Sequence, residues 1–333
     1  MKYVIYRLHF TAPVHFGATE HGGRLEQTEL SYPSDTLFSA LCSEWARQGM
    51  SEALADFIEQ NRRGEVVFSD LLPYREDAAG VQLYLPKPVL LIERDEQPQA
   101  TSLDDVRQQA TARKKLKKLT YIRAGRMAEY LAAMRTGRPF SSEESFGTEG
   151  IAVRVNQRGA EPLPYAVSSF SFRADAGMYV IARVETEAQG AVIAGLLTSL
   201  GLSGIGGKRS SGYGAFTLVQ SAEALAAMAG ADAAALCSML SDEQASWQMC
   251  LSSLLSDAAA LSAAVGAQYS LRKRGGFLTP EDGAPMKKKN SIYLLAAGSC
   301  LPQRLSGRVA SLGRSHGHEV LRSGVSLYAG LRV

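Results

Sequence analysis

The chain has 333 residues, of which 46% are hydrophobic and 21% are charged, a globular composition with room for roughly two domains. No apolar run reaches the roughly 18 residues of a membrane span, and the first residues show no secretory signal, so we expect a cytoplasmic protein without membrane contact. Four scattered cysteines match neither a zinc knuckle nor a disulfide framework, so we expect no metal and no cofactor. They are Cys42, Cys237, Cys250 and Cys300.

The net charge is only +3, but the charges are unevenly placed. Residues 107–126 hold eight Lys or Arg and no acid, and after Glu243 eleven basic residues stand against four acids. A basic surface on a nearly neutral protein indicates a polyanionic partner. A single basic run is also typical of a solvated surface, so this alternative stays open for each run taken alone.

The N-terminal elements are predicted as follows. Residues 2–10 form a strand buried mostly on both faces, and residues 11–30 form a loop. A helix then begins with Ser34 or Asp35 as its N-cap, and its apolar stripe recurs every four residues. That stripe is Leu37, Leu41 and Trp45. We expect a second helix over residues 52–60 and strands over residues 65–68, 81–85 and 89–92.

A polar, charged segment with helical tendency covers about residues 93–149, and we interpret it as an insertion that stands off the core. Strands are predicted over residues 151–155, 168–173 and 178–185, a helix over 191–200 and a strand over 215–219. Two successive strand–helix–strand units are typical of a ferredoxin-like (RRM-like) domain. We therefore predict an α+β fold with a first domain over residues 1–220.

A helical connector is predicted over residues 221–245, followed by a smaller domain over residues 246–333. Its strands are expected at residues 247–255, 269–273, 292–296 and 326–331, as a degenerate second ferredoxin-like copy. The loops of this domain carry Gly275-Gly276, a lysine run over residues 287–289 and a segment rich in glycine and histidine over residues 313–318.

The most informative stretch is residues 201–216, where six glycines surround Lys208, Arg209, Ser210 and Ser211. Glycine accepts positive φ and allows close backbone approach, so such a loop can wrap a phosphodiester strand with its N–H groups while the cations supply charge. On composition alone, a glycine-rich turn between a helix and a strand explains the stretch equally well.

Two phosphate-binding motifs are excluded here. In a P-loop alignment of Gly207-Lys208, Leu202 occupies the place of the first glycine and Arg209 that of the Ser or Thr. A Rossmann fingerprint needs a strand before it and a helix after it, and the predicted order is the reverse. A nucleoside-triphosphate or dinucleotide site is therefore not expected.

The spacing G-x-G-x5-G-x-G from Gly204 to Gly214 resembles the glycine-rich signature loop of the RAMP superfamily, the RRM-like RNA-binding proteins of CRISPR systems. Residues 13–17 and 34–42 resemble the opening of one of its families, the fourth Csm subunits, which cap the crRNA 5′ end in type III-A effectors. Residues 114–118 match the lysine-rich middle segment of that family, and residues 288–293 with 298–299 match its ending. Its arginine-containing strand is matched loosely at residues 154–158, where residues 156–160 replace the usual acid and Thr-Gly turn, so no crRNA role is carried onto Arg158.

This resemblance implies a non-catalytic subunit with two RRM-like domains that grips the repeat-derived 5′ tag of the crRNA. It further implies docking to the large Palm-domain subunit and to the repeated backbone Csm subunit, with target RNA contacted only indirectly. The inserted segment would act as a thumb that separates tag from spacer.

Single-stranded RNA is held by phosphate contacts and by bases stacked on aromatic rings. The glycine stretch offers cations for phosphate contacts and an aromatic ring for stacking. His15 and Gly17 follow the first strand, at an edge where ligands commonly bind. The cations before Gly275 are typical of phosphate contacts, although a solvated face explains these cations equally well. The RNA-contacting residues expected here are His15, Gly17, Arg154, Gly204, Gly206, Gly207, Lys208, Arg209, Ser210, Ser211, Gly212, Tyr213, Arg272, Lys273 and Arg274.

Two other functions were weighed. A metal-free crRNA-processing endoribonuclease could use His9, His15 or His21 as general acid or base, but His9 lies within a strand pattern and no partner for His15 is apparent. Asp35 is the nearest carboxylate for a metal-dependent cut, and helix capping explains it. A general RNA-binding RRM protein would carry the RNP aromatic pattern, which this sequence lacks.

Overall fold

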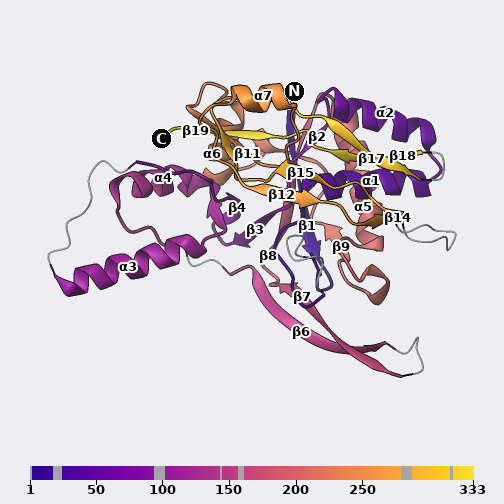
Figure 1. Cartoon of the computed structure of the whole chain (residues 1–333), viewed down its shortest axis with the longest axis horizontal. Coiled ribbons are helices and arrows are strands. Elements are labelled where there is room, and N and C mark those ends of the chain that lie inside the picture. Colours follow the sequence, from indigo (N-terminus) through magenta and orange to yellow (C-terminus); the bar gives the residue numbers. More distant parts are fainter. Residues whose placement is uncertain are drawn as a thin grey trace.

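The computed structural model describes residues 2–17, 25–93, 102–142, 145–156, 161–278, 287–315 and 318–333. Within these residues the protein is a mixed α+β structure, and its strands pair in antiparallel sheets (Figure 1). No described helix is both long enough and apolar enough to cross a membrane.

Among the described residues, eight strands form one large sheet with β1 and β8 at its centre. β1 pairs with β8 from Lys2 opposite Val184 to Leu8 opposite Met178. The sheet order is β10-β1-β8-β3-β4-β5, with β2 also beside β8 and β9 also beside β1. The strands are β1 (Lys2–Phe10), β2 (Val67–Phe68), β3 (Leu72–Asp77), β4 (Gly80–Pro86), β5 (Tyr121–Arg123), β8 (Ala176–Val184), β9 (Phe216–Leu218) and β10 (Glu223–Ala224).

Three helices cover one face of this sheet: α1 (Ser34–Arg47), α2 (Ser51–Arg62) and α5 (Glu187–Ser203). Successive side chains of a strand point to opposite faces, so Val4, Tyr6 and Leu8 of β1 share a buried cluster with α1 and α5. The predicted helical stripe is confirmed, because the side chains of Leu37, Leu41 and Trp45 are buried in this cluster.

The opposite face of the sheet packs against the C-terminal half of the chain. Ile5 of β1 and Tyr179 of β8 are buried in one cluster with Met249 and Leu327. The two halves therefore share a hydrophobic core, and the boundary predicted at residues 221–245 does not separate two independent cores. Within those residues, β10 joins the large sheet and α6 (Ala231–Ser241) contributes Leu236 to the shared core.

The C-terminal strands are distributed over several small sheets. β11 (Trp247–Cys250), β16 (Cys300–Leu301) and β19 (Tyr328–Leu331) form a three-stranded sheet, next to the short helix α7 (Ala258–Ala263). The remaining pairs are β12 (Leu271–Arg274) with β15 (Ile292–Leu295), β13 (Phe277–Leu278) with β14 (Lys287–Lys288), and β17 (Val309–Ser315) with β18 (His318–Ser323). The described residues thus place the strands predicted for residues 246–333 in more than one sheet. Lys287 and Lys288, predicted to lie in a loop, form β14.

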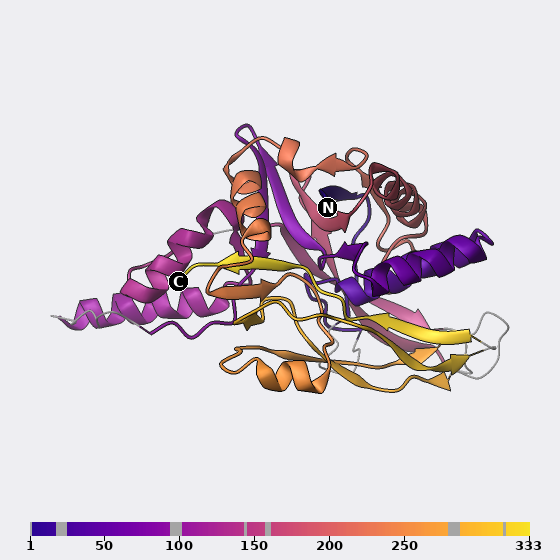
Figure 2. The same cartoon turned by 90° about the horizontal axis from the view of Figure 1, so that it is seen from above.

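Two elements project from this body (Figures 1 and 2). One is α3 (Leu103–Lys118), which buries none of its residues, and the other is the long hairpin of β6 (Gly147–Asn156) and β7 (Leu163–Phe172). The insertion predicted over residues 93–149 is only partly correct, because Ile122 of β5 and Tyr130 of α4 (Met127–Thr136) are buried in the core. Only α3 of the described part of that segment stands off.

Three further differences concern strands. The strand predicted over residues 89–92 is absent, and Val89 forms only an isolated bridge with Ser299. β3, β17 and β18 were not predicted. The hairpin strands, predicted over residues 151–155 and 168–173, are each ten residues long, and most of β6 is exposed.

Candidate functional site

The glycine loop, residues 204–214, connects α5 to β9 and packs against the segment that follows β1. The N–H of Gly207 donates to the carbonyl of His15 at 2.8 Å, and the N–H of Gly214 donates to the carbonyl of Pro13 at 2.9 Å. These bonds bring together two of the stretches singled out in the sequence, residues 13–17 and the glycine loop.

The close approach explains why glycine occupies these positions. A Cβ on Gly206 would lie 2.7 Å from the carbonyl oxygen of His15, and one on Gly214 would lie 1.9 Å from that of Ile205. Both glycines also have positive φ, 86° and 79°, which side chains disfavour. Lys208 has a φ of 60° and is the only non-glycine residue of the described chain with positive φ.

The tip of the loop is open to solvent. Residues 206–208 are half-buried and residues 209–212 are exposed, with Arg209–Ser211 forming a short 3-10 turn. The N–H groups of Ser211 and Gly212 close this turn onto the carbonyls of Lys208 and Arg209. The loop is thus anchored at its base and presents Arg209 and two serine hydroxyls at its tip.

Reciprocal cation–π contacts join the loop to the projecting hairpin. The ammonium of Lys208 lies 4.6 Å from the ring centre of Tyr165, and the guanidinium of Arg154 lies 5.3 Å from that of Tyr213. Arg154 also donates a hydrogen bond of 3.2 Å to the Tyr213 hydroxyl. Arg154 and Tyr165 are direct partners across the β6–β7 ladder. A single residue pair of the hairpin therefore makes both contacts with the loop. We call these four residues the loop–hairpin clamp.

Two predicted RNA contacts are corrected by burial. His15 is 4% exposed, and its Nδ1 lies 2.8 Å from the carbonyl oxygen of Ser168 in β7. Tyr213 is 7% exposed beneath Arg154. A nucleobase cannot stack on a covered ring, so we assign both side chains to the support of the loop. Gly17, in contrast, is exposed and pairs with Thr28.

A surface pocket of about 240 Å³ lies between the glycine loop and α1. Gly206 and Arg209 line it from the loop, and Thr36, Ser43 and Arg47 line it from α1. Two arginines, two hydroxyls and a glycine backbone are donors of the kind that bind a phosphate group. Arg47 also pairs with Glu44 of α1 at 2.8 Å. Arg47 was not predicted as a site residue. The signal that could have indicated it is the polar face of α1, where small polar side chains and then Arg47 recur at spacings of three and four residues.

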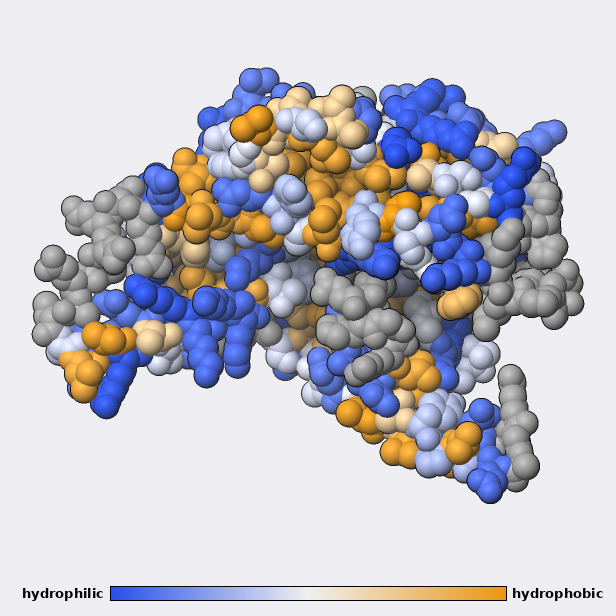
Figure 3. Space-filling view, in the orientation of Figure 1, coloured by the Kyte–Doolittle hydropathy of each residue, from blue (hydrophilic) through white to orange (hydrophobic). Residues whose placement is uncertain are grey.

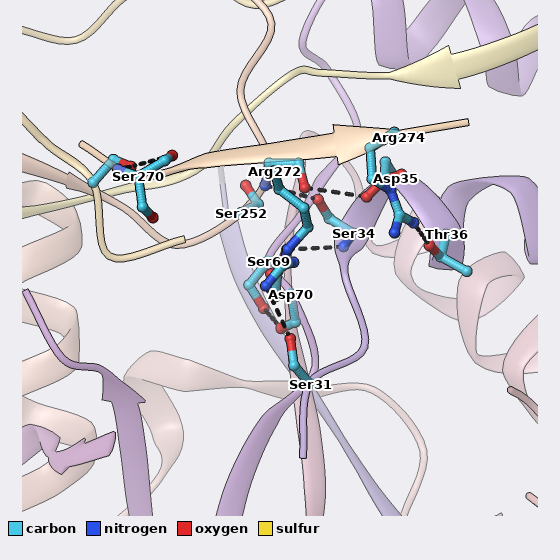
Figure 4. A network of polar contacts seen from close by, with 12 residues as sticks. Ser31, Ser34, Asp35, Thr36, Ser69, Asp70, Ser252, Ser270, Arg272 and Arg274 are labelled. Carbon is cyan, nitrogen blue, oxygen red and sulfur yellow. Dashed lines mark hydrogen bonds and ion pairs between the residues drawn. The ribbon is translucent and has the colours of Figure 1, made fainter. Parts of the chain in front are cut away.

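The three cations predicted near Gly275 do not act alike. Lys273 is exposed and lies 6.0 Å from the ring of Tyr293. Arg272 lies 3.7 Å from Asp70, and Figure 4 shows it reaching toward Asp70 and Ser31. Arg274 is 7% exposed, so its side chain offers little surface to a phosphate, and the predicted contact stays a prediction.

Arg274 is committed to an internal ion cluster instead (Figure 4). Its Nε donates to Asp35 at 2.8 Å, and Arg322 of β18 binds the same carboxylate. Asp35 is fully buried and lies within α1, whose N-cap is Pro33, so the predicted capping role of Ser34 or Asp35 is wrong. The cluster joins α1 to the C-terminal half and leaves Arg274 no free face toward a ligand.

The two buried carboxylates of this region titrate in opposite directions. Burial opposes ionisation of Asp35, but Arg274 and Arg322 outweigh it and hold its pKa below the usual value. Burial raises the pKa of Asp70 to about 6, despite the attraction of Arg272. Asp70 also accepts a 2.8 Å hydrogen bond from the N–H of Ser34.

The histidines considered for RNA cleavage differ in their placement. His9 lies within β1 and His15 is buried, while His21 falls outside the described residues. In the part of the chain that the structure describes, no group of His, Cys, Asp or Glu side chains is placed to hold a metal ion.

Fold and site together define an α+β protein in which a glycine loop, clamped by a projecting hairpin, exposes an arginine and two hydroxyls. A family described as the CRISPR Csm4 C-terminal domain matches residues 243–331. The CRISPR system Cms protein Csm4 of Mycobacterium tuberculosis is 31% identical over 312 residues, which cover 91% of this chain and 90% of that protein. The Csm4 protein of Streptococcus thermophilus is 28% identical over 314 residues, 94% of this chain and 93% of that protein.

Solved structures agree in fold. A chain in the crystal structure of a Csm1–Csm4 cassette in complex with cA4 matches with a TM-score of 0.56 and 17% identity, covering 100% of this chain and 99% of that one. A chain in the crystal structure of a Csm3–Csm4 subcomplex of the type III-A CRISPR-Cas interference complex matches with a TM-score of 0.58 and 17% identity, covering 97% and 99%. With the sequence relatives, these findings show that the chain belongs to the Csm4 family of CRISPR proteins.

Proposed function

We propose that this chain is a non-catalytic, crRNA-binding subunit of a type III-A CRISPR-Cas (Csm) interference complex in antiviral defence, and that its glycine loop holds the 5′ repeat tag of the crRNA. The observation that carries the proposal is the exposed tip of the loop, where Arg209 and Arg47 both line a pocket of about 240 Å³. Anchored backbone N–H groups and guanidinium donors fix a sugar-phosphate strand without reading its sequence.

The hairpin supplies a second part of the proposal. Ile151, Val153 and Val155 of β6 are 69%, 73% and 53% exposed, and their alternate spacing places them on one face of the strand. Apolar side chains gather on this projection in Figure 3. We assign the thumb role to this hairpin instead of residues 93–149: its aliphatic face would pack against unpaired bases and separate tag from spacer.

The assembly role follows from the fold and the relatives. The order β9-β1-β8-β3, with α1 after β1 and α5 after β8, supports a ferredoxin-like arrangement of the N-terminal part. Because related chains occur in solved structures of Csm1–Csm4 and Csm3–Csm4 complexes, we propose that this chain bridges the large Palm-domain subunit and the repeated backbone subunit.

The proposal is tested by replacing Lys208 and Arg209 with glutamine in one variant and measuring its binding to a repeat-derived RNA at several salt concentrations. Each lost phosphate contact lowers the salt slope by about 0.7 for a single strand. We therefore expect weaker binding and a slope smaller by about 0.7–1.4.

The matched control replaces Arg62 and Arg63, two adjacent exposed cations at the end of α2, with glutamine. It should leave affinity and slope close to those of the unmodified protein. An unchanged slope in the loop variant would refute the proposed contact. The RNA recovered from each reaction should be intact, and cleavage that His15→Ala abolishes would favour the endoribonuclease alternative.

A further inference from the structure

α3 carries a strongly basic surface to which the proposed function assigns no role. Its 16 residues include six cations and two acids, and none of its residues is buried. The acids lie in the first turn and three lysines in the last, which stabilises the helix through its dipole. Helix stability accounts for that placement, but not for a cationic helix held away from the body of the protein.

The helix has an inner and an outer face. Asp105, Gln109, Ala112 and Leu116 are its half-buried residues, spaced by three and four, and they border a groove shared with α4. Side chains on the opposite side of the helix therefore face solvent. These are Arg107, Lys114, Lys117 and Lys118, and hydrophilic side chains cover this part of α3 in Figure 3.

The outer charges are available to a partner. Arg107 pairs with Asp104 at 3.4 Å, but no described carboxylate forms an ion pair with Lys114, Lys117 or Lys118. The helix end does not need these lysines as hydrogen-bond donors, because the Lys87 ammonium donates to the carbonyl of Leu116 at 2.9 Å. The charges of these three lysines are thus not neutralised by any described carboxylate.

A cavity of about 640 Å³ lies between the end of α3 and the loop that precedes α1. Thr28 and Ser31 line one wall, Arg272 lines another, and Lys87 and Lys118 line the side nearest α3. The hydroxyl of Thr28 accepts a 3.1 Å hydrogen bond from the N–H of Phe16, next to the segment that the glycine loop contacts. Glu29, Asp70 and Glu149 also line the cavity, so its charge is mixed, and the excess of positive charge lies on α3 itself.

We infer that α3 is a second RNA-contacting surface, along which the phosphodiester backbone of a strand lies after it has left the glycine loop. Arg107, Lys114 and Lys118 recur at i, i+7 and i+11, so they share a face and span about 16 Å, the length of several nucleotides. This inference rests on the proposed function, because it takes the strand to be the one held by the loop. The unpaired lysines spaced along one face of α3 suit the regularly spaced charges of a phosphodiester backbone, which favours RNA over an acidic protein as the occupant.

The test compares two RNAs and two variants of the full chain. One RNA is a repeat-derived strand of about eight nucleotides, and the other extends it by about ten at the 3′ end. The α3 variant carries Lys114→Gln, Lys117→Gln and Lys118→Gln, which preserve helix propensity, as circular dichroism can verify. The loop variant carries Lys208→Gln and Arg209→Gln.

For the α3 variant we expect unchanged binding of the short RNA and a salt slope for the long RNA that is smaller by about 2. A control with Arg62→Gln, Arg63→Gln and Arg332→Gln, exposed cations outside α3, should alter neither.

Unchanged binding of the long RNA by the α3 variant would overturn the inference. In that case, weaker binding of both RNAs by the loop variant would still support the proposed function. If instead the loop variant affected neither RNA while the α3 variant weakened the long one, the proposed function would fail and the α3 surface would remain. Loss of binding to an acidic partner subunit, with RNA binding intact, would replace RNA by protein as the occupant.

Discussion

At the scale of single residues, Asp35 is the side chain that most firmly ties the two halves together. It belongs to α1, and its partners Arg274 and Arg322 lie 239 and 287 residues further along the chain. All three side chains are buried. A buried charge without a partner is strongly unfavourable, so each member of this cluster depends on the others.

Replacing Asp35 with asparagine should destabilise the protein by about 3–5 kcal/mol, because it leaves two buried guanidiniums without a counter-charge. Urea unfolding of Asp35→Asn would measure this loss. Asp56→Asn, at an exposed position of α2, is the control and should change stability by less than about 0.5 kcal/mol. Equal stability of the two variants would show that the cluster contributes little.

The same cluster predicts a pH dependence. The pKa of Asp35 is lower in the folded protein than in the unfolded chain, so its contribution is complete above the unfolded value of about 3.9. The contribution is lost as the pH falls through the lower, folded pKa. The stability difference between the unmodified protein and Asp35→Asn should therefore shrink on acidification below about pH 4.

Sequence reasoning failed at this residue for a physical reason. An aspartate at the start of a helix pattern is explained locally by capping, and nothing local indicates arginines more than two hundred residues away. The same limit applies to Arg274, whose neighbours in sequence are exposed or half-buried while its own side chain is buried. The glycine loop was easier to predict from the sequence, because positive φ and close backbone approach require glycine at the positions concerned.

At the scale of elements, the loop–hairpin clamp determines how the hairpin stands on the body. β7 is attached at its base by a pair of backbone hydrogen bonds between Val14 and Phe170. Further out, the contacts of Lys208 with Tyr165 and of Arg154 with Tyr213 brace the hairpin against the loop. β6 itself has no buried face, because none of its ten residues is buried.

Tyr165→Leu should loosen this brace while it keeps an apolar side chain in place. Loss of one cation–π contact costs about 0.5–1 kcal/mol at an exposed site. We expect faster hydrogen–deuterium exchange over residues 161–168, with the global stability nearly unchanged. Tyr269→Leu, an exposed tyrosine outside the hairpin, is the control, and equal exchange in the two variants would mean that the clamp does not brace the hairpin.

The elements with strong patterns were predictable, and those defined by their partners were not. β1 and α1 carry enough apolar residues at regular spacing to identify them. β3 ends in Arg75, Glu76 and Asp77 and is a strand because β8 and β4 pair with it. The projection of the hairpin could not be predicted, because exposed and buried strands can share the same β-branched residues.

At the scale of the whole molecule, one core serves both halves of the chain. Side chains alternate along β1 and β8. Those on one face of the sheet pack against α1 and α5, and those on the other face pack against the C-terminal strands. The mixed α+β class and the family resemblance were accessible from the sequence. The shared core was not, because the apolar residues of β11 and β19 do not show which surface they cover.

The central claim is that the tip of the glycine loop lies on the 5′ tag of the guide. It is tested most directly by placing a photoreactive residue at Ser210, which is exposed, assembling the complex with its crRNA and mapping the crosslinked nucleotides. The same substitution at Glu52, exposed on α2, serves as the control. We expect crosslinks at Ser210 to fall within the repeat-derived 5′ tag and none from Glu52. Crosslinks confined to the spacer, or absent from Ser210 in a correctly assembled complex, would contradict the account.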